Sequence, residues 1–222
     1  MLINDDYRNN KGTFDVCIFD PPFDIWHSID FVPTAKTYIC FTNFQNRHHV
    51  QERFGNPKFE MIWHFLDGRW VSHKMPRHTH EHILIYGELA NEAYTGPINV
   101  NREPINKGYG AIGRDKLTTP RLYQPRERKM LNSVITVPRR HTNACGLWGK
   151  PLEVAMPILE WLVSPNDDVW DGFAGSGTFG VCVNKLGANY FGSELDTKIY
   201  NAARERLNNI NYPLFDRCNN AV

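Results

Sequence analysis

Two short segments, far apart in the chain, combine residue types that could do chemistry. The first is Asp20-Pro21-Pro22-Phe23, which directly follows the apolar run 14–19. Proline has no backbone N–H, so a proline pair ends a strand and presents carbonyl acceptors. The Asp20 carboxylate and the Pro21 carbonyl could hold an exocyclic amino group with its lone pair free, and Phe23 could stack on a flat base. The alternative is an ordinary turn with a core phenylalanine.

The second segment is glycine-rich and reads Asp171-Gly172-Phe173-Ala174-Gly175-Ser176-Gly177-Thr178. Small residues let the backbone pass close to a ligand, and a helix beginning near Thr178 offers free N–H groups. Glu194 lies seventeen residues after Gly177, where a carboxylate can accept hydrogen bonds from two ribose hydroxyls. Gly175, Gly177 and Gly180 also fit G-x-G-x-x-G, so this turn alone does not separate a nicotinamide dinucleotide from S-adenosylmethionine.

The elements that must position these segments follow from the apolar pattern. Near-continuous apolar runs at 14–19, 37–42, 59–63 and 82–86 predict strands buried on both faces, as in a parallel sheet. The last third of the chain predicts strands at 169–171 and 189–193, and helices at 151–163, 179–186 and 199–210. This β-turn-α-β-α order is typical of a doubly wound α/β sheet. Pro157 should kink or shorten the first of these helices.

The order of the segments bears on the cofactor. A dehydrogenase of the Rossmann type needs a second mononucleotide-binding half after its glycine fingerprint. Only 28 residues follow Glu194, so the rest of the sheet must come from the N-terminal part.

Charge is segregated along the chain although the total is only +1. Residues 1–30 carry −4, residues 31–150 carry +9 and residues 151–222 carry −4. Apolar periodicity is lost over approximately 87–140, and residues 101–140 carry +7, which suits contacts to phosphates; the alternative is a solvated charged loop. The candidate nucleic-acid contacts are Arg102, Arg114, Lys116, Arg121, Arg126, Arg128, Lys129, Arg139 and Arg140.

Other classes of protein fit less well. The five cysteines are scattered without a C-x-x-C pair, which favours a reduced, cytoplasmic protein over a disulfide or zinc scaffold. There is no long apolar window and no signal-peptide pattern at the N-terminus, so we expect no membrane partner. His73, His78, His80 and His82 lack a supporting carboxylate or cysteine cluster, and no metal site is predicted.

Together these segments resemble the S-adenosylmethionine-dependent DNA amino-methyltransferases. That family carries a [D/N/S]-P-P-[Y/F/W] catalytic motif and an F-x-G-x-G cofactor motif, and in its β class the catalytic motif comes first, as here. Further matches are the segments 80–86, 149–160 and 192–204, and Asp5 matches the acid of an N-terminal segment weakly.

The resemblance implies a Rossmann-like methyltransferase fold, mostly parallel and circularly permuted, in a single domain over residues 1–222, with a target-recognition insertion at approximately 87–140. It implies site-specific methyl transfer from S-adenosylmethionine to adenine N6 of a base flipped out of double-stranded DNA. Cytosine-N4 or RNA amino methylation is the alternative, and an NAD(P) oxidoreductase or a catalytically silent nucleic-acid binder comes after that. A homodimer is a hypothesis, because so short a chain offers only one small recognition region.

The implied site residues fall into two groups. The catalytic group is Asp20, Pro21, Pro22 and Phe23. The cofactor contacts are Asp5, Lys150, Asp171, Phe173, Gly175, Ser176, Gly177, Thr178 and Glu194.

Three positions depart from the family pattern. Gly172 stands where proline is usual, which should loosen the turn. Phe65 replaces a lysine two residues after the strand tryptophan Trp63. The segment before Lys150 is altered, with His141 nine residues upstream.

Overall fold

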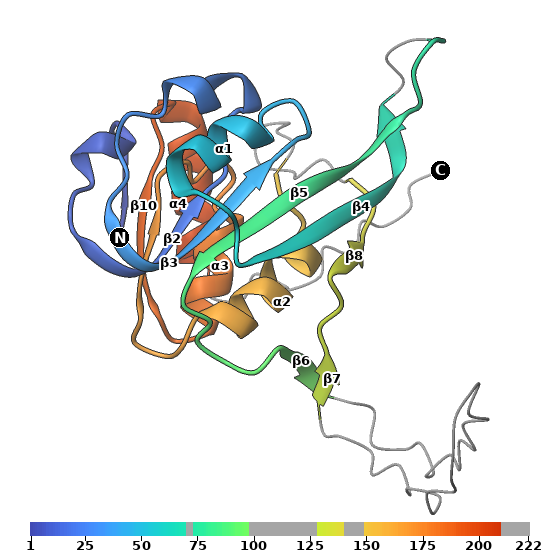
Figure 1. Cartoon of the computed structure of the whole chain (residues 1–222). Coiled ribbons are helices and arrows are strands. Elements are labelled where there is room, and N and C mark those ends of the chain that lie inside the picture. Colours follow the sequence, from blue (N-terminus) through green and yellow to red (C-terminus); the bar gives the residue numbers. More distant parts are fainter. Residues whose placement is uncertain (70–72, 98–127, 140–148, 210–222) are drawn as a thin grey trace, which may run out of the picture.

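The computed structural model describes residues 1–69, 73–97, 128–139 and 149–209, and within this part an eight-stranded sheet forms the centre of the molecule (Figure 1). The strand order is β1-β10-β9-β2-β3-β5-β4-β8. The bounds of these strands are β1 Leu2–Ile3, β2 Thr13–Phe19, β3 Thr34–Thr42, β4 Phe59–Arg69, β5 His78–Gly87, β8 Val134–Thr136, β9 Asp168–Asp171 and β10 Asn189–Ser193.

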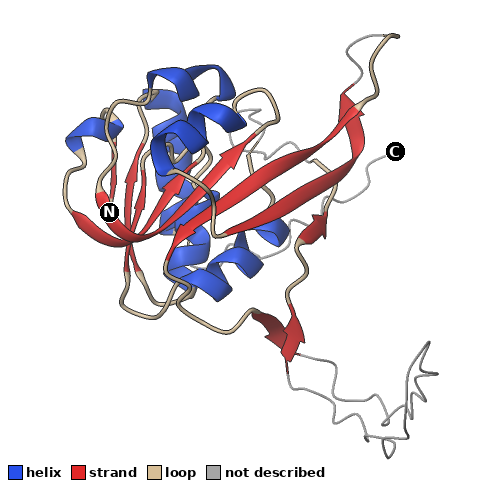
Figure 2. Ribbon diagram, viewed as in Figure 1, coloured by secondary structure: helices blue, strands red, loops and turns tan. Residues whose placement is uncertain are grey.

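The sheet is mostly parallel, as predicted, with one reversed strand. Neighbouring strands from β1 through β10, β9 and β2 to β3 run parallel, whereas β5 is antiparallel to both β3 and β4. A parallel pair needs a crossover of a dozen or more residues. The connection from β4 to β5 is shorter than that, so the two strands form a hairpin, which projects beyond the body of the protein (Figure 2).

Helices cover both faces of the sheet, which makes it doubly wound. They are the α-helices α1 Arg47–Phe54, α2 Leu152–Leu162, α3 Thr178–Lys185 and α4 Thr197–Asn208, with short 3-10 helices η1 Tyr7–Asn9 and η2 Phe23–Ser28. Alternate residues of β3 point to different cores. Ile39 and Phe41 pack in the cluster that includes α2 and α3, whereas Cys40 packs with Trp26 of η2 and Val50 of α1.

Local sequence accounts for the helix ends. The Asp196 carboxylate accepts hydrogen bonds from the N–H groups of Lys198 and Ile199 and so caps α4. Gly187, with φ +72°, follows α3. Pro157 lies inside α2, which runs on to Leu162, so of the two predicted effects, a kink or a shorter helix, the shortening does not occur. No described helix is both long and apolar enough to cross a membrane.

The stretch 87–140 is not irregular throughout. Its β6 Tyr94–Pro97 and β7 Arg128–Met130 pair antiparallel, and β8 adds a parallel strand to the edge of the main sheet beside β4. Each of these strands has only three or four residues, too few for a periodic signal in the sequence.

Candidate active site

The two sequence segments meet at one edge of the sheet. β2 and β9 are parallel neighbours in which Ile18 pairs with Asp171, and β10 lies on the other side of β9 with Gly192 opposite Asp171. Because carboxyl ends of parallel strands share an edge, the turn at Asp20, the glycine-rich turn and Glu194 leave the sheet side by side. This is the edge at which ligands bind in open α/β sheets.

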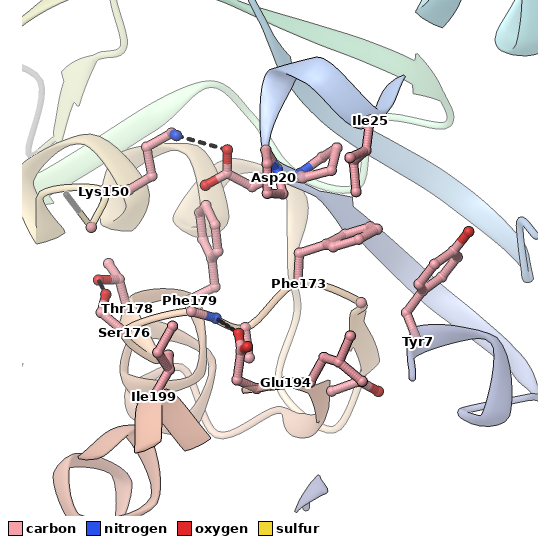
Figure 3. Close-up of a pocket in the computed structure, with 18 of the residues that line it drawn as sticks. Tyr7, Asp20, Ile25, Lys150, Phe173, Ser176, Thr178, Phe179, Glu194 and Ile199 are labelled. Carbon is pink, nitrogen blue, oxygen red and sulfur yellow. Dashed lines mark hydrogen bonds and ion pairs between the residues drawn. The ribbon is translucent and has the colours of Figure 1, made fainter. Parts of the chain in front are cut away.

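A cavity of about 1120 Å³ opens at this edge (Figure 3). Of the predicted site residues, those that line it are Asp5, Asp20, Pro21, Pro22, Phe23, Lys150, Phe173, Gly175, Ser176, Thr178 and Glu194. Asp171 and Gly177 do not line it. Its volume lies at the upper end of ligand pockets, which measure about 300–1,000 Å³.

The turn that begins at Asp20 is largely enclosed. Pro21 is buried, and the side chain of Asp20 is only 16% exposed. Pro22 precedes η2, and its carbonyl accepts the N–H of Ile25 at 3.1 Å. Phe23 then begins η2 with its side chain partly exposed on the cavity wall, where a flat base could stack on it.

Asp20 belongs to a buried cluster of alternating charges. The Lys150 ammonium lies 2.7 Å from Asp20 Oδ1 and 3.3 Å from Glu81 Oε2, and Arg139 Nη2 lies 3.0 Å from Glu81 Oε1. Phe23, Phe41 and Trp63 surround the same ammonium, with ring centroids 5.1 to 5.8 Å away. Lys150, predicted as a cofactor contact, is therefore an ion-pair partner of Asp20.

The cluster changes the protonation of its members. Burial raises the pKa of Asp20 to about 6, although the positive charge of Lys150 opposes this rise; the negative charge of Glu81 adds to it. Burial works to lower the pKa of Lys150, but the charges of Asp20 and Glu81 outweigh it and the pKa is raised. At neutral pH the pair is thus a carboxylate and an ammonium.

The glycine-rich turn holds Glu194 in place. Gly175 and Gly177 have φ values of +50° and +76°, in the left-handed region that favours glycine. The N–H of Gly175 donates to Glu194 Oε2 at 2.9 Å, and the N–H of Asp196 donates to Oε1 at 2.9 Å. Each oxygen keeps a further lone pair, so Glu194 can still accept hydrogen bonds from hydroxyls in the cavity.

Asp171 supports this turn from behind the cavity wall. It is fully buried, accepts the Tyr190 hydroxyl at 2.7 Å on Oδ2, and accepts the N–H of Phe173 at 3.3 Å on Oδ1. Burial raises its pKa to about 7. Asp171 therefore supports the backbone of the turn at Phe173.

Gly172 has a steric reason for departing from the family pattern. A Cβ at this position would lie 2.1 Å from the Trp170 ring. The indole is fully buried, and its N–H donates to the carbonyl of Asn10 at 3.0 Å. The turn expected to be loose is therefore filled by the side chain of Trp170.

Sequence reasoning misses some residues of the site. Arg206 of α4 is buried, and its guanidinium donates to the Ser176 carbonyl at 3.0 Å and to Thr178 Oγ1 at 3.1 Å. The family pattern matches Arg204 instead, which lies over the Tyr200 ring at 5.6 Å. The sequence signal for Arg206 is its position three residues after Ala203, which places both on the buried face of the helix.

Two more missed residues line the cavity. Tyr7 of η1 has its ring 4.8 Å from that of Phe173. Glu81 lies inside the segment 80–86, which matches the family pattern but gives no role to this residue.

The predicted nucleic-acid contacts are placed only in part. Arg139 lines the cavity, and its guanidinium lies 3.7 Å over the ring of Phe65. Phe65 is the residue that replaces the lysine of the family pattern. Arg128 and Lys129 belong to β7. The others lie outside the described residues: Arg102, Arg114, Lys116, Arg121, Arg126 and Arg140.

Comparison with solved structures places this architecture among known folds. The M1.HpyAVI–SAM complex matches with 19% identity and a TM-score of 0.58, covering 93% of this chain and 98% of that chain. TTHA0409 from Thermus thermophilus, complexed with S-adenosyl-L-methionine, matches with 16% identity, a TM-score of 0.57 and 96% coverage of both chains. The cytosine-N4-specific PvuII DNA methyltransferase matches with 9% identity and a TM-score of 0.56, covering 86% of this chain and 78% of that chain.

The sequence comparisons assign the family. A search of curated proteins found no match. The family model N6_N4_Mtase, described as DNA methylase, matches residues 25–205, most of the chain. The catalytic turn at Asp20 lies just outside the matched range, and the glycine-rich turn and Glu194 lie within it. The protein therefore belongs to the N6_N4_Mtase family of DNA methylases.

Proposed function

We propose that this protein transfers a methyl group from S-adenosylmethionine to the N6 amino group of adenine in DNA. The observation that carries the proposal is the shared cavity, where Asp20 and Phe23 face the glycine-rich turn and Glu194. The proposal is supported by membership of a DNA methylase family and by the S-adenosylmethionine complexes of proteins with a similar fold.

The residues at the glycine-rich end fit the methyl donor. Glu194 would accept hydrogen bonds from its ribose hydroxyls, and the rings of Tyr7 and Phe173 offer an apolar wall for its adenine. The bound donor would supply a sulfonium methyl group. Asp20 and Phe23, at the other end of the cavity, leave room for the acceptor base.

The acceptor end fits an exocyclic amino group. The Asp20 carboxylate and the Pro21 carbonyl would accept hydrogen bonds from its two N–H groups and leave the nitrogen lone pair directed at the methyl carbon. As the new N–C bond forms, the S–C bond breaks and its electron pair stays on sulfur. The nitrogen becomes positive and then loses one proton, which the Asp20 carboxylate can accept and pass to water.

A base inside a duplex cannot reach this cavity, so we propose that adenine is flipped out of double-stranded DNA and stacks on Phe23. The acid that begins the catalytic motif favours adenine over cytosine. The same geometry accepts the amino group of cytosine, so the N4 product is the main alternative.

The test is to incubate the protein with S-adenosylmethionine labelled in the methyl group and, in parallel, DNA or RNA of mixed sequence, then to digest to nucleosides. We expect the label in 6-methyladenine. Label in 4-methylcytosine, or only in RNA substrates, would reassign the acceptor, and NADH binding without S-adenosylmethionine binding would reject the reaction class. Asp20→Ala should abolish transfer while the protein still binds the donor.

A further inference from the structure

We infer that Glu81, anchored by Arg139, is a positioning residue that shares Lys150 with Asp20 and thereby keeps the catalytic carboxylate oriented toward the acceptor amino group. The effect of Glu81 on methyl transfer rests on the proposed function, whereas its effect on Asp20 follows from the contacts of the charge cluster.

Glu81 is buried in the sheet. Its side chain is 6% exposed and lies on β5, with Asp20 at the end of β2, two strands away in the sheet. A carboxylate so deeply buried needs charged partners. Arg139 donates a hydrogen bond to Oε1 at 3.0 Å, and the Lys150 ammonium forms an ion pair with Oε2 at 3.3 Å without a hydrogen bond.

The two charged partners of Glu81 come from separate segments of the chain. Arg139 is three residues after β8, and Lys150 is two residues before α2. Glu81 therefore ties together two separate segments at the cavity, and the stacking of Arg139 on Phe65 holds the far end of the arrangement.

Lys150 needs more than one contact to hold its position. An ammonium has three N–H groups and no preferred direction, so contact with Asp20 alone would not fix its position. The contact with Glu81 and the rings of Phe41 and Trp63 do so. Lys150 then occupies Asp20 Oδ1 only, and no residue in the described part of the chain donates to Oδ2. That oxygen is left for the amino group.

The charges around Asp20 predict opposite effects of two substitutions. The groups that act on it are Lys150, which favours its ionised form, and Glu81, which disfavours it; Asp171 of β9 lies close enough to interact with it electrostatically. In Glu81→Gln the Asp20 carboxyl should titrate at lower pH than in the wild type. In Lys150→Met it should titrate at higher pH.

The experiment has two independent measurements. The Asp20 carboxyl is titrated by carbon NMR, with its signal assigned by Asp20→Asn, and the single-turnover rate is measured across pH with the donor saturating. For Glu81→Gln we expect Asp20 to titrate at lower pH, and the acidic limb of the rate-pH profile to move to lower pH with it. The plateau rate should fall by about tenfold or more, while the affinity for the methyl donor stays unchanged. Glu81→Asp should restore the midpoint and part of the rate.

The control is Glu60→Gln. Glu60 is a paired carboxylate in the same sheet, 2.9 Å from Arg47 and 2.6 Å from His82, and does not line the cavity; this variant should leave the midpoint and the rate unchanged. An unchanged Asp20 midpoint in Glu81→Gln would overturn the inference, as would a slower rate with no shift of the limb. If the wild type transfers no methyl group, the proposed function fails, but the NMR titration still decides whether Glu81 acts on Asp20.

Discussion

At the scale of single residues, two buried carboxyls at the ends of neighbouring strands have different surroundings. Asp20 has an ammonium at 2.7 Å, whereas the hydrogen-bond donors on Asp171 are the neutral Tyr190 hydroxyl and Phe173 N–H. Burial raises both pKa values, to about 6 for Asp20 and about 7 for Asp171. In the proposed mechanism Asp20 acts as a carboxylate beside an ammonium, whereas Asp171 is hydrogen-bonded within the glycine-rich turn.

Asp171 should make the free energy of unfolding depend on pH. Its pKa in the folded protein is above the usual 3.8, so the folded state binds the proton more tightly than the unfolded state. The resulting stability is fully present below pH 3.8 and is lost as the pH rises through about 7. Replacing Asp171 with asparagine removes this titration.

The measurement is urea unfolding of the wild type and Asp171→Asn between about pH 5.5 and 8. The difference in unfolding free energy should move in favour of the variant by about 2 kcal/mol as the pH rises. A loss of unfolding free energy from a poorer hydrogen bond to Phe173 is the same at every pH, so it does not affect the change with pH. A difference that stays the same at all pH values would contradict the assignment.

At the scale of elements, the glycine-rich turn is positioned from two sides, by the Trp170 ring beneath Gly172 and by Arg206 of α4 against Ser176 and Thr178. Both supports come from residues outside the motif itself. The shape that binds the methyl donor therefore depends on contacts between elements as well as on the glycines.

Arg206→Lys should weaken binding of S-adenosylmethionine by about tenfold. Both hydrogen bonds come from Nη1 of the guanidinium. Lysine keeps the charge, but its side chain is one atom shorter and does not place its nitrogen at that position. Affinity is measured by calorimetry, with circular dichroism to show that the variant is folded. Arg204→Lys, two residues earlier on the same helix and partly stacked on Tyr200, is the matched control and should bind normally. Equal losses in both variants would contradict the role of Arg206.

Gly172→Ala should lower the free energy of unfolding by about 1–3 kcal/mol, because the added methyl overlaps the Trp170 ring. Thermal or urea unfolding measures this cost. In a Trp170→Leu background the same substitution should cost much less, since the space is then open. Equal costs in the two backgrounds would show that the indole is not the reason for glycine at this position.

Sequence reasoning places the elements and residues whose signal is local. The strands β2, β9 and β10 and the helix α3 are predicted nearly to the residue, because each is an apolar run next to a motif. α1 is not, since Val50 is its only buried residue, and β1 has only two residues.

The same limit applies to the site. Asp20 and Glu194 are predicted because each follows the end of a strand. Glu81 pairs with Arg139, 58 positions away, and Arg206 donates to Ser176, 30 positions away. A local pattern does not contain such long-range pairings, so the folded structure is needed to find them.

At the scale of the whole molecule, the charge zones correspond to parts of the fold. The two acidic ends of the chain supply four adjacent strands of the sheet, β1, β10, β9 and β2. The basic middle supplies the other half of the sheet, with β6 to β8 and the residues between them. Strands from acidic segments on one side of the sheet and from the basic segment on the other would orient anionic DNA toward the basic side.

This arrangement predicts DNA binding that weakens with salt, and it separates two arginines that sequence alone treats alike. Arg139 contacts Glu81 and the Phe65 ring, so its charge is used inside the protein; Arg121 lies in the net-positive stretch and outside the described residues. Arg121→Ala should reduce the slope of log affinity against log salt by about one, as expected for one lost phosphate contact. Arg139→Gln should leave the slope unchanged while slowing methyl transfer. Fluorescence anisotropy with a labelled duplex at several salt concentrations gives both slopes, and an Arg139→Gln slope reduced as much as that of Arg121→Ala would return Arg139 to the DNA-binding surface.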